Sequence, residues 1–402
     1  MRTQDLAGLY EGVTRICGTD YVQRRGKALD AFPGSIGEMS ELLKMCDAER
    51  IPVAMEGSGS KKAWLEPGEP ELYVRTARMA RVLEHPWQDM TCTVEAGCCW
   101  QAMQEILAQH GQRVALDPLW PGRATVGGVV AANDSGALRL RYGGLRDLLI
   151  GMTVVLADGT IARSGGKVVK NVAGYDLPKL FCGSWGTLAC IAEVTFRLHA
   201  IARQTMTITA VAESAEALGR LLLQLLDSQL NLQAMQLRTD ADGFALDVRV
   251  AGTPEVLASQ RDGVLATAAS LAIPAECGED DVWLRREALF HAADEAIVFK
   301  ATLLPAQIAS AAAAIAACGG SVVAQAHGIL TGRAPAAAVG EVTAMRSKLE
   351  AEGGSLVVLR SAPDVRLERW GRLPASIPVM RALKQQFDPN GILNGGRFMG
   401  QL

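Results

Sequence analysis

The sequence predicts an α+β protein of two domains, with the boundary near residue 200. The chain has 402 residues, which is more than one ordinary hydrophobic core accommodates. Its first half is rich in glycine and turns. From Ala202 onward, strand-like and helical runs alternate, which favours an antiparallel sheet covered by helices. We therefore expect one domain over residues 1–200 and a second α+β domain over residues 201–402.

In the first half, hydrophobic patterning predicts short strands and a few helices. Residues 1–34 carry no readable periodicity, and we interpret them as a docking arm. Apolar residues at helical spacing then predict a helix over 37–50. The Asp158-Gly159 dipeptide between two apolar runs predicts a hairpin, because Asp-Gly is favoured in tight turns. The other predicted elements are strands at 51–55, 72–76, 90–96 and 191–198 and a helix at 100–110.

In the second half, the same criteria predict a repeating series of strands and helices. The strands are expected at 205–211, 234–239, 244–250, 297–301, 321–326 and 356–360. The helices are expected at 216–227, 254–269, 305–317 and 336–351. A last helix at 376–387 ends at the Asp-Pro-Asn-Gly turn of residues 388–391, and a tail follows it.

Composition and charge exclude several classes of function. The chain is 49% hydrophobic and 21% charged, as globular proteins are, and its formal net charge is −3. It has no basic block or RNA-binding motif, so we expect no nucleic-acid partner. The start lacks an apolar signal region, and the most apolar stretch, residues 308–318, is too short to span a bilayer. We expect a cytoplasmic protein that contacts the inner membrane at most peripherally, through partners.

The nine cysteines are scattered through apolar segments, and none forms a Cys-x-x-Cys pair. This distribution is typical of reduced core thiols rather than of a zinc or iron–sulfur site. We therefore expect no metal site in this chain. If electrons leave a cofactor here one at a time, an iron–sulfur cluster must lie on another chain.

The segment 56–61, Glu-Gly-Ser-Gly-Ser-Lys, follows a predicted buried strand. Its glycines allow backbone N–H groups to converge on an anion and a phosphate to approach closely. Lys61 adds positive charge. The spacing fits neither a nucleotide P-loop nor a dinucleotide-binding fingerprint. The segment is therefore either a phosphate-binding turn or an ordinary surface turn.

Three further segments are unusually rich in small residues. In 124–136 (ATVGGVVAANDSG), a large flat ligand could lie against the main chain and meet its amides. Close helix–sheet packing is the alternative, but it explains the glycines and not the Thr, Asn and Ser among them. The other two segments are 139–147 (RLRYGGLRD) and 165–188 (GGKVVKNVAGYDLPKLFCGSWGTL).

In their content and order, these four segments resemble the FAD-binding domain of the vanillyl-alcohol-oxidase/PCMH flavoprotein superfamily. The segment 387–398 (FDPNGILNGGRF) resembles the closing segment of that superfamily. The resemblance covers residues 33–200 and 385–398. It implies a PCMH-type FAD-binding domain of two α+β subdomains, followed by an antiparallel-sheet α+β cap domain. The tail 388–399 would return to the flavin.

Within the superfamily, the chain is similar to the E subunits of glycolate oxidase. The glycine turn continues into Ser-Lys, and the segment 95–97 (EAG) is followed by Trp-Gln and later by His-Gly-Gln-Arg and Asp-Pro at 117–118. The segment 139–147 also matches closely. The resemblance implies a subunit that works beside a catalytic flavin subunit and an iron–sulfur subunit.

The resemblance also implies where FAD is held. Backbone amides of the glycine turn would contact the pyrophosphate, and the tail would approach the isoalloxazine. Many relatives attach the flavin to a His in this turn, which here has none, so we expect non-covalent FAD. The implied cofactor contacts are Gly57, Ser58, Gly59, Ser60, Lys61, Pro118, Thr125, Val126, Gly127, Gly128, Ser135, Gly136, Tyr142, Gly143, Arg146, Asp147, Gly186, Thr187, Ile191, Asn394 and Arg397.

Some of these positions have a structural alternative. Arg146 and Asp147 either contact the ligand or form a structural ion pair. Lys170 and Asn171, in the fourth segment, are either site residues or structural ones. Trp185 stands where the superfamily has an acidic residue, which alters the expected pocket.

The second half lacks the His-rich metal and substrate motif of the catalytic hydroxy-acid dehydrogenases in this superfamily. The chain has five His, none of them paired at ligand spacing. His327 is the candidate catalytic base, and a structural His is the alternative. Hydride transfer from a hydroxy acid also needs a cation for the carboxylate, and the sequence does not single one out.

The resemblance therefore implies an FAD-binding subunit of a glycolate oxidase, which oxidises glycolate to glyoxylate and passes electrons on through an iron–sulfur subunit. One alternative is a self-sufficient FAD-dependent dehydrogenase of a small 2-hydroxy acid. The other is a structural subunit that has lost FAD.

Overall fold

The computed structural model describes residues 6–65, 68–166, 176–241, 243–291 and 295–402. The chain forms two compact units. Unit 1 comprises Met1–Asp134, Gly144–Ile201 and Leu373–Leu402, and unit 2 comprises Ser135–Gly143 and Ala202–Arg372. The last thirty residues thus pack with the first unit, whereas the predicted second domain ran to residue 402. The structure is mixed helix and sheet, as predicted.

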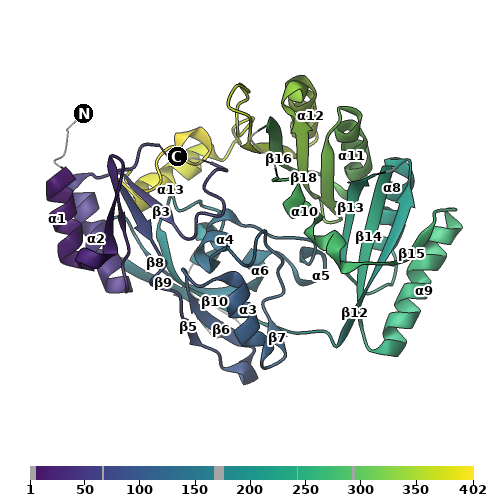
Figure 1. Ribbon diagram of the computed structural model, residues 1–402, viewed down its shortest axis with the longest axis horizontal. Coiled ribbons are helices and arrows are strands. Elements are labelled where there is room, and N and C mark those ends of the chain that lie inside the picture. Colours follow the sequence, from purple (N-terminus) through teal and green to yellow (C-terminus); the bar gives the residue numbers. More distant parts are fainter. Residues whose placement is uncertain (1–5, 66–67, 167–175, 242, 292–294) are drawn as a thin grey trace. The chain divides into compact units, whose positions relative to one another are not determined.

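The first layer of unit 1 is a four-stranded sheet in the order β1-β2-β4-β3. Its strands are β1 Val22–Arg25, β2 Ala28–Ala31, β3 Val53–Glu56 and β4 Leu72–Arg75. The strands β2, β4 and β3 run parallel, so their carboxyl ends lie at one edge. The helices α1 (Leu6–Cys17) and α2 (Ile36–Glu49) pack in the same hydrophobic core as this sheet. They are drawn in purple at the left of Figure 1.

The docking-arm interpretation of residues 1–34 is wrong for its described part. Leu9, Val13 and Leu29 are fully or almost fully buried in the core of this sheet. The apolar positions of α1 lie four residues apart and the two strands are only four residues long, so the segment is too fragmented to show a period. Sequence periodicity needs a longer window than this.

The second layer of unit 1 is a five-stranded antiparallel sheet in the order β5-β6-β10-β8-β9. Its strands are β5 Val82–Glu84, β6 Thr91–Glu95, β8 Leu149–Val155, β9 Ile161–Gly165 and β10 Cys190–Arg197. The helices of this layer are α3 Trp100–Ala108, α4 Val126–Ala132, α6 Leu145–Leu148 and α7 Leu177–Phe181. A two-stranded ribbon pairs β7 (Gln112–Arg113) with β11 (His199–Ala200).

The hairpin predicted around Asp158-Gly159 is confirmed by the antiparallel pairing of β8 with β9. Gly159 has a φ of +84°, and a Cβ there would lie 2.6 Å from the carbonyl oxygen of Ser40 on α2. The glycine therefore serves both the turn and the close approach of the hairpin to the helix.

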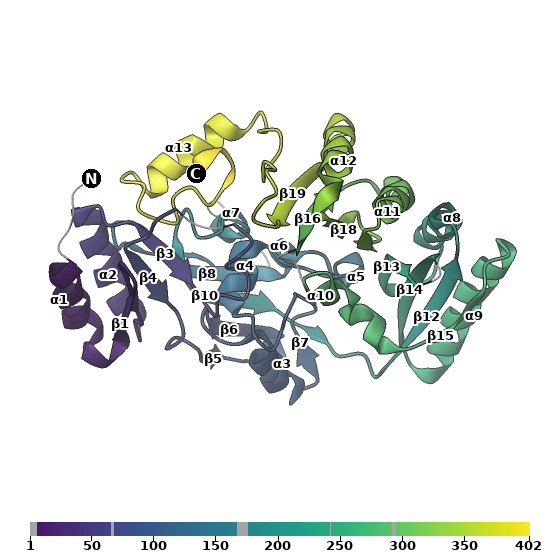
Figure 2. The same ribbon diagram turned by 45° about the horizontal axis from the view of Figure 1, so that its top comes forward.

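The C-terminal segment completes the first sheet. The helix α13 (Ile377–Phe387) and the tail after it lie beside β3, as Figures 1 and 2 show in yellow. The amide of Val53 donates to the carbonyl of Ile392 at 2.8 Å, and the amide of Asn394 donates to the carbonyl of Val53 at 2.8 Å. Residues 340 positions apart in the sequence thus form a short parallel bridge.

Unit 2 is an eight-stranded antiparallel sheet with helices along one face (Figure 1). The strand order is β15-β12-β14-β13-β17-β18-β16-β19. The strands are β12 Gln204–Ala212, β13 Leu232–Asp240, β14 Gly243–Gly252, β15 Ala275–Gly278, β16 Ala296–Thr302, β17 Ser321–Gln325, β18 Ile329–Pro335 and β19 Ser355–Arg360. The helices are α8 Ala215–Leu226, α9 Pro254–Ser270, α11 Ile308–Ala317 and α12 Val339–Ala351. The antiparallel sheet confirms the predicted fold of the second half.

The opposite face of this sheet is polar although it is buried. Side chains alternate between the two faces of a strand, so Met235 and Leu237 enter the helix-covered core while Gln236 and Arg238 point the other way. Arg238 Nε donates to Asp247 Oδ2 at 2.9 Å, and both side chains are almost fully buried. The short helices α5 (Arg139–Tyr142) and α10 (Arg285–Ala288) also belong to this unit.

Among the described residues, no helix is both long enough and apolar enough to cross a bilayer.

Candidate functional site

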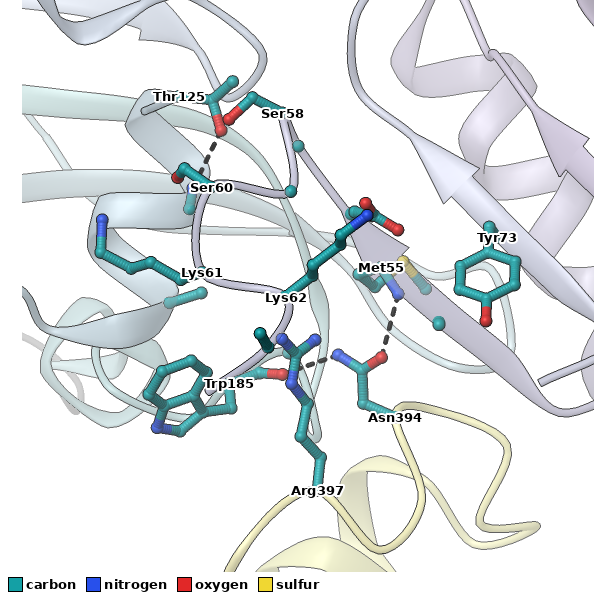
Figure 3. Close-up of a pocket in the computed structure, with 18 of the residues that line it drawn as sticks. Met55, Ser58, Ser60, Lys61, Lys62, Tyr73, Thr125, Trp185, Asn394 and Arg397 are labelled. Atoms are coloured by element: carbon teal, nitrogen blue, oxygen red, sulfur yellow. Dashed lines mark hydrogen bonds between the residues drawn. The ribbon is translucent and has the colours of Figure 1, made fainter. Parts of the chain in front are cut away.

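A cavity of about 360 Å³ lies in unit 1, next to the ends of β3 and β4. Four segments that are distant in the sequence form its wall: the glycine turn, the start of α4, the turn at Trp185-Gly186 and the C-terminal tail (Figure 3). Its lining residues are Arg25, Ala54, Met55, Glu56, Gly57, Ser58, Gly59, Ser60, Lys61, Lys62, Ala63, Tyr73, Thr125, Gly128, Ala131, Trp185, Gly186, Asn394 and Arg397.

The glycine turn approaches α4 too closely for a side chain. A Cβ at Gly57 would lie 2.1 Å from Thr125 Oγ1. Thr125 is the N-cap of α4, and its Oγ1 accepts a hydrogen bond from the amide of Gly128 at 3.3 Å (Figure 3). Gly59 has a φ of +73°, which favours glycine. At its two glycines the turn thus presents main chain to the cavity.

Asn394 joins three parts of the cavity wall. Its Oδ1 accepts from the amide of Met55 at 3.0 Å, and its Nδ2 donates to the carbonyl of Trp185 at 2.6 Å (Figure 3). A Cβ at Gly186 would lie 2.5 Å from that Nδ2, so this turn also needs glycine. The tail, the end of β3 and the Trp185-Gly186 turn are therefore held together by one buried amide.

Cations surround the cavity. Arg25 and Arg75 pair with Glu56 at 3.2 and 3.0 Å, and the Arg25 guanidinium lies 3.8 Å from the centre of the Tyr73 ring. Arg397 is the more telling group, because its Nε is buried and has no hydrogen-bond partner among the described residues. Burial lowers the pKa of Arg397, and nearby Glu56 opposes that shift. A half-buried guanidinium whose Nε is enclosed and unused fits an anionic ligand.

Lys61 lines the cavity, but its ammonium faces another group. Its Nζ lies 3.1 Å from Asp134 Oδ2, and both side chains are almost fully buried. The same Nζ lies 5.7 Å from the ring centre of Trp64 and 5.6 Å from that of Trp120. In Figure 3, Lys62 extends from the opposite side of the turn. Lys62, which the sequence analysis did not single out, is thus a further cation of the cavity wall.

Ten of the residues implied by the resemblance line this cavity: Gly57, Ser58, Gly59, Ser60, Lys61, Thr125, Gly128, Gly186, Asn394 and Arg397. Others lie in unit 1 away from the lining: Pro118, Val126, Gly127, Arg146, Asp147, Thr187 and Ile191.

Several of these outlying residues have packing or backbone roles. A Cβ at Gly127 would lie 2.8 Å from that of Ala96, so this glycine allows α4 to pack closely. Arg146 Nη2 donates to the carbonyl of Cys182 at 3.1 Å. Asp147 Oδ2 accepts from the amide of Gly144 at 2.8 Å. Lys170 and Asn171 lie outside the described residues.

The remaining implied residues, Ser135, Gly136, Tyr142 and Gly143, belong to unit 2. The carbonyl of Ser135 accepts from Arg286 Nη1 at 2.6 Å, and the Tyr142 hydroxyl accepts from Gln233 Nε2 at 3.2 Å. Their contact with the cofactor remains a prediction.

Sequence reasoning missed Arg25, Met55, Tyr73 and Ala131 as lining residues. Arg25 lies in the segment for which no periodicity could be found. Tyr73 lines the cavity because β4 pairs in parallel with β3, and strand pairing is not visible in a single sequence. A usable signal was the parallel-sheet rule that loops after neighbouring strands meet at one edge.

His327 lies in unit 2, two residues after β17. Neither ring nitrogen has a hydrogen-bond partner among the described residues, and both are buried. Burial lowers the pKa of His327 to about 3, and the positive charges of Arg139, Lys300 and Arg286 act in the same direction. The imidazole is therefore neutral at pH 7.

Comparisons with known proteins agree with the geometry of the cavity. Residues 28–165 match the family model described as FAD binding domain. The chain is 36% identical over 186 residues to glycolate oxidase subunit GlcD of Bacillus subtilis, covering 46% of this chain and 40% of the relative. It is also 36% identical over 177 residues to the mitochondrial D-lactate dehydrogenase [cytochrome] of Arabidopsis thaliana, covering 44% of this chain and 31% of the relative. The chain thus spans less than half the length of these relatives.

Solved structures share the fold over almost the whole chain. Substrate-bound p-cresol methylhydroxylase superposes with a TM-score of 0.76 at 15% identity, covering 97% of this chain and 96% of the other. Alkyldihydroxyacetonephosphate synthase gives a TM-score of 0.76 at 17% identity, covering 97% of this chain and 86% of the other. The chain is therefore a flavoprotein with an FAD-binding domain at residues 28–165 and the fold of the vanillyl-alcohol-oxidase/PCMH superfamily.

Proposed function

We propose that this chain is the FAD-binding subunit of an oxidoreductase that oxidises a small 2-hydroxy acid, and that its reaction is glycolate to glyoxylate. Two relatives support the substrate class, because glycolate and D-lactate are both 2-hydroxy acids. FAD, when bound, supplies the acceptor for the two electrons. The observation that carries the proposal is the cavity of unit 1, where the glycine turn and the unpartnered Nε of Arg397 meet in a chain whose residues 28–165 match an FAD binding domain.

The cavity of unit 1 would hold FAD without a covalent bond. The amides of residues 57–60 would donate to the diphosphate, and the cations Arg25, Lys62 and Arg397 would balance its charge. Gly57 keeps the turn free of a side chain next to Thr125. The unused Arg397 Nε is the donor that such a ligand would satisfy.

If this chain itself binds the hydroxy acid, His327 of unit 2 is its candidate base. Arg139, Arg286 and Lys300, whose charges lower the pKa of His327, would supply positive charge for a carboxylate. The neutral imidazole supplies a lone pair for the hydroxyl proton. A bound carboxylate would offset the three positive charges and raise the pKa of His327, so that substrate binding itself strengthens the base.

The proposed partners are a catalytic flavin subunit and an iron–sulfur subunit. The B. subtilis relative is described as a subunit, which supports an assembly. Within the described part of the chain, no group of three His, Cys, Asp or Glu is placed to hold a metal ion. In this proposal, one-electron transfer out of the flavin would use a cluster on the iron–sulfur subunit.

A second candidate is a self-sufficient dehydrogenase of a 2-hydroxy acid. The D-lactate dehydrogenases of A. thaliana and of Archaeoglobus fulgidus, the latter 36% identical over 182 residues, favour it. Loss of FAD is not proposed, because the FAD-binding domain is present.

Anaerobic reduction of the bound flavin tests these proposals. The complex isolated from its host should lose its flavin absorbance when glycolate is added, and His327→Asn should slow that bleaching. His291→Asn, at an exposed His of the same unit, is the matched control. Equal bleaching of the isolated chain by D-lactate would favour the second candidate. A bound flavin that neither acid reduces would overturn both.

A further inference from the structure

The helix α13 is held to unit 1 mainly by its last turn. None of its residues is fully buried. At its end, however, Lys384 is largely enclosed, with a side chain that is 12% exposed. Its Nζ donates to the carbonyl of Thr187 at 2.7 Å and to the carbonyl of Leu393 at 2.9 Å, and it pairs with Asp388 at 2.5 Å.

Asp388 fixes the turn that follows the helix. Its side chain is fully buried. Oδ1 accepts from the amide of Ile392 at 2.9 Å, and Oδ2 accepts from the amide of Leu393 at 2.8 Å. Lys384 and Asp388 thus form a closed node, in which the two charges pair with each other and bind two backbone segments, Thr187 and residues 392–393.

The two carbonyls that Lys384 holds each adjoin a residue of the cavity wall. Thr187 follows Gly186, and Leu393 precedes Asn394. Asn394 in turn holds the amide of Met55 and the carbonyl of Trp185. The node therefore sets the positions of three cavity walls, although neither Lys384 nor Asp388 lines the cavity.

We propose that Lys384 and Asp388 are positioning residues for FAD, which hold the Trp185-Gly186 turn and the tail in the arrangement that the cofactor requires. They lie outside the matched FAD-binding domain, which ends at residue 165. The inference rests on the proposal that this cavity holds FAD, and not on the hydroxy-acid reaction.

The chemistry of the node fits this role. Removing one charge would leave the other uncompensated in a buried place, together with unsatisfied carbonyls. Burial lowers the pKa of Lys384, and Asp388 opposes this shift, as expected for an ammonium taken out of water. The ring contact of Phe387 with Phe181, at 5.5 Å between centres, keeps the helix end in place if the charge is removed.

The test is the affinity of the full-length apoprotein for FAD, followed by flavin fluorescence and by the visible circular dichroism of the bound flavin. Lys384→Met should weaken FAD binding by about tenfold or more and change the dichroism, since tenfold is about 1.4 kcal/mol. Lys384→Arg, which keeps a cation, should recover most of the affinity. Arg381→Met, at an exposed position of the same helix, should bind FAD as the unchanged protein does.

A lower melting temperature of Lys384→Met with unchanged FAD affinity and dichroism would overturn the inference, because the node would then be merely structural. Arg397→Met separates this failure from that of the cavity. If Arg397→Met loses FAD and Lys384→Met does not, only the present inference fails. If neither loses FAD, the cavity is not the cofactor site.

A second measurement needs no variant. FAD should slow hydrogen exchange at the amides of Ile392, Leu393 and Asn394, because ligand binding stabilises the segments that it requires. Exchange at these three amides that is unchanged by FAD would also overturn the inference.

Discussion

The cavity of unit 1 and the polar face of unit 2 each contain a buried group without a hydrogen-bond partner among the described residues, but they are built differently. In the cavity, glycines bring main chain to the surface, and the unpartnered groups include the Nε of the charged Arg397. In unit 2, strand side chains make the polar face, and the unpartnered groups include the neutral His327 in the turn after β17. The first arrangement suits a large anion that contacts backbone. The second suits a small ligand that brings its own negative charge.

The largest expected effect tests the buried ion pair of Lys61 at the cavity of unit 1. Lys61→Met removes one partner of a fully buried pair and should cost about 3–5 kcal/mol in the free energy of unfolding. Lys179→Met removes one partner of an exposed pair, with side chains 50% and 52% exposed, and should cost at most about 1 kcal/mol. Urea denaturation of the apoproteins gives both values. Equal losses would contradict the view that Lys61 is committed to Asp134.

A second prediction tests whether the cavity of unit 1 depends on the close approach of the glycine turn to the start of α4. Gly57→Ala places a Cβ 2.1 Å from Thr125 Oγ1. This overpacking should cost about 1–3 kcal/mol, and FAD affinity should fall by about tenfold. Gly8→Ala is the control, since a Cβ there meets nothing within 4 Å. Unchanged flavin content in Gly57→Ala would show that the turn can move away without loss.

A third prediction tests whether the imidazole of His327 in unit 2 is neutral when the protein is folded. The pKa of His327 is lowered from 6.5 to about 3, so the unfolded chain takes up a proton first as the pH falls. The folded state should therefore lose stability between pH 6.5 and about 3, by at most about 1.4 kcal/mol per pH unit. His327→Asn should lack this component. Parallel pH profiles of the two proteins, measured by denaturation, would mean that His327 is not buried as a neutral base.

The smallest expected effect concerns a side chain of the glycine turn. Ser60→Ala keeps the backbone amide and removes only a hydroxyl, so FAD affinity should change by less than about 1 kcal/mol, or roughly fivefold. Titration of the apoprotein with FAD measures it. A loss as large as that of Gly57→Ala would mean that side chains, and not main chain, hold the ligand.

The difference between a site built from glycine turns and one built from strand side chains explains what could be predicted from the sequence. Glycines that permit a positive φ or a close approach leave a mark in the sequence, so the turn at 57–60, Gly128 and Gly186 could be assigned to one site. The residues that depend on pairing of distant strands left no such mark. Arg25 and Tyr73 reach the cavity through the order β1-β2-β4-β3, which no local pattern specifies.

The cations that lower the pKa of His327 also come from segments that are distant in the sequence. Arg139, Arg286 and Lys300 come from two short helices and a strand, and a single sequence gives no reason to group them. The alternation of Gln236 and Arg238 with Met235 and Leu237 was a local signal that one face of the sheet is polar. The helix and strand positions were largely predictable because they depend on short-range periodicity.

The bridge between Val53 and Leu393 has a consequence for biosynthesis. Domains generally fold as they leave the ribosome, from the N-terminus onward. Here the cavity wall lacks one side until residue 394 has been translated, so the nascent first half cannot finish its own binding site. Flavin capture should therefore follow translation of residue 394, and an apoprotein with a loose 373–402 segment should be the species that first meets the cofactor in the cell.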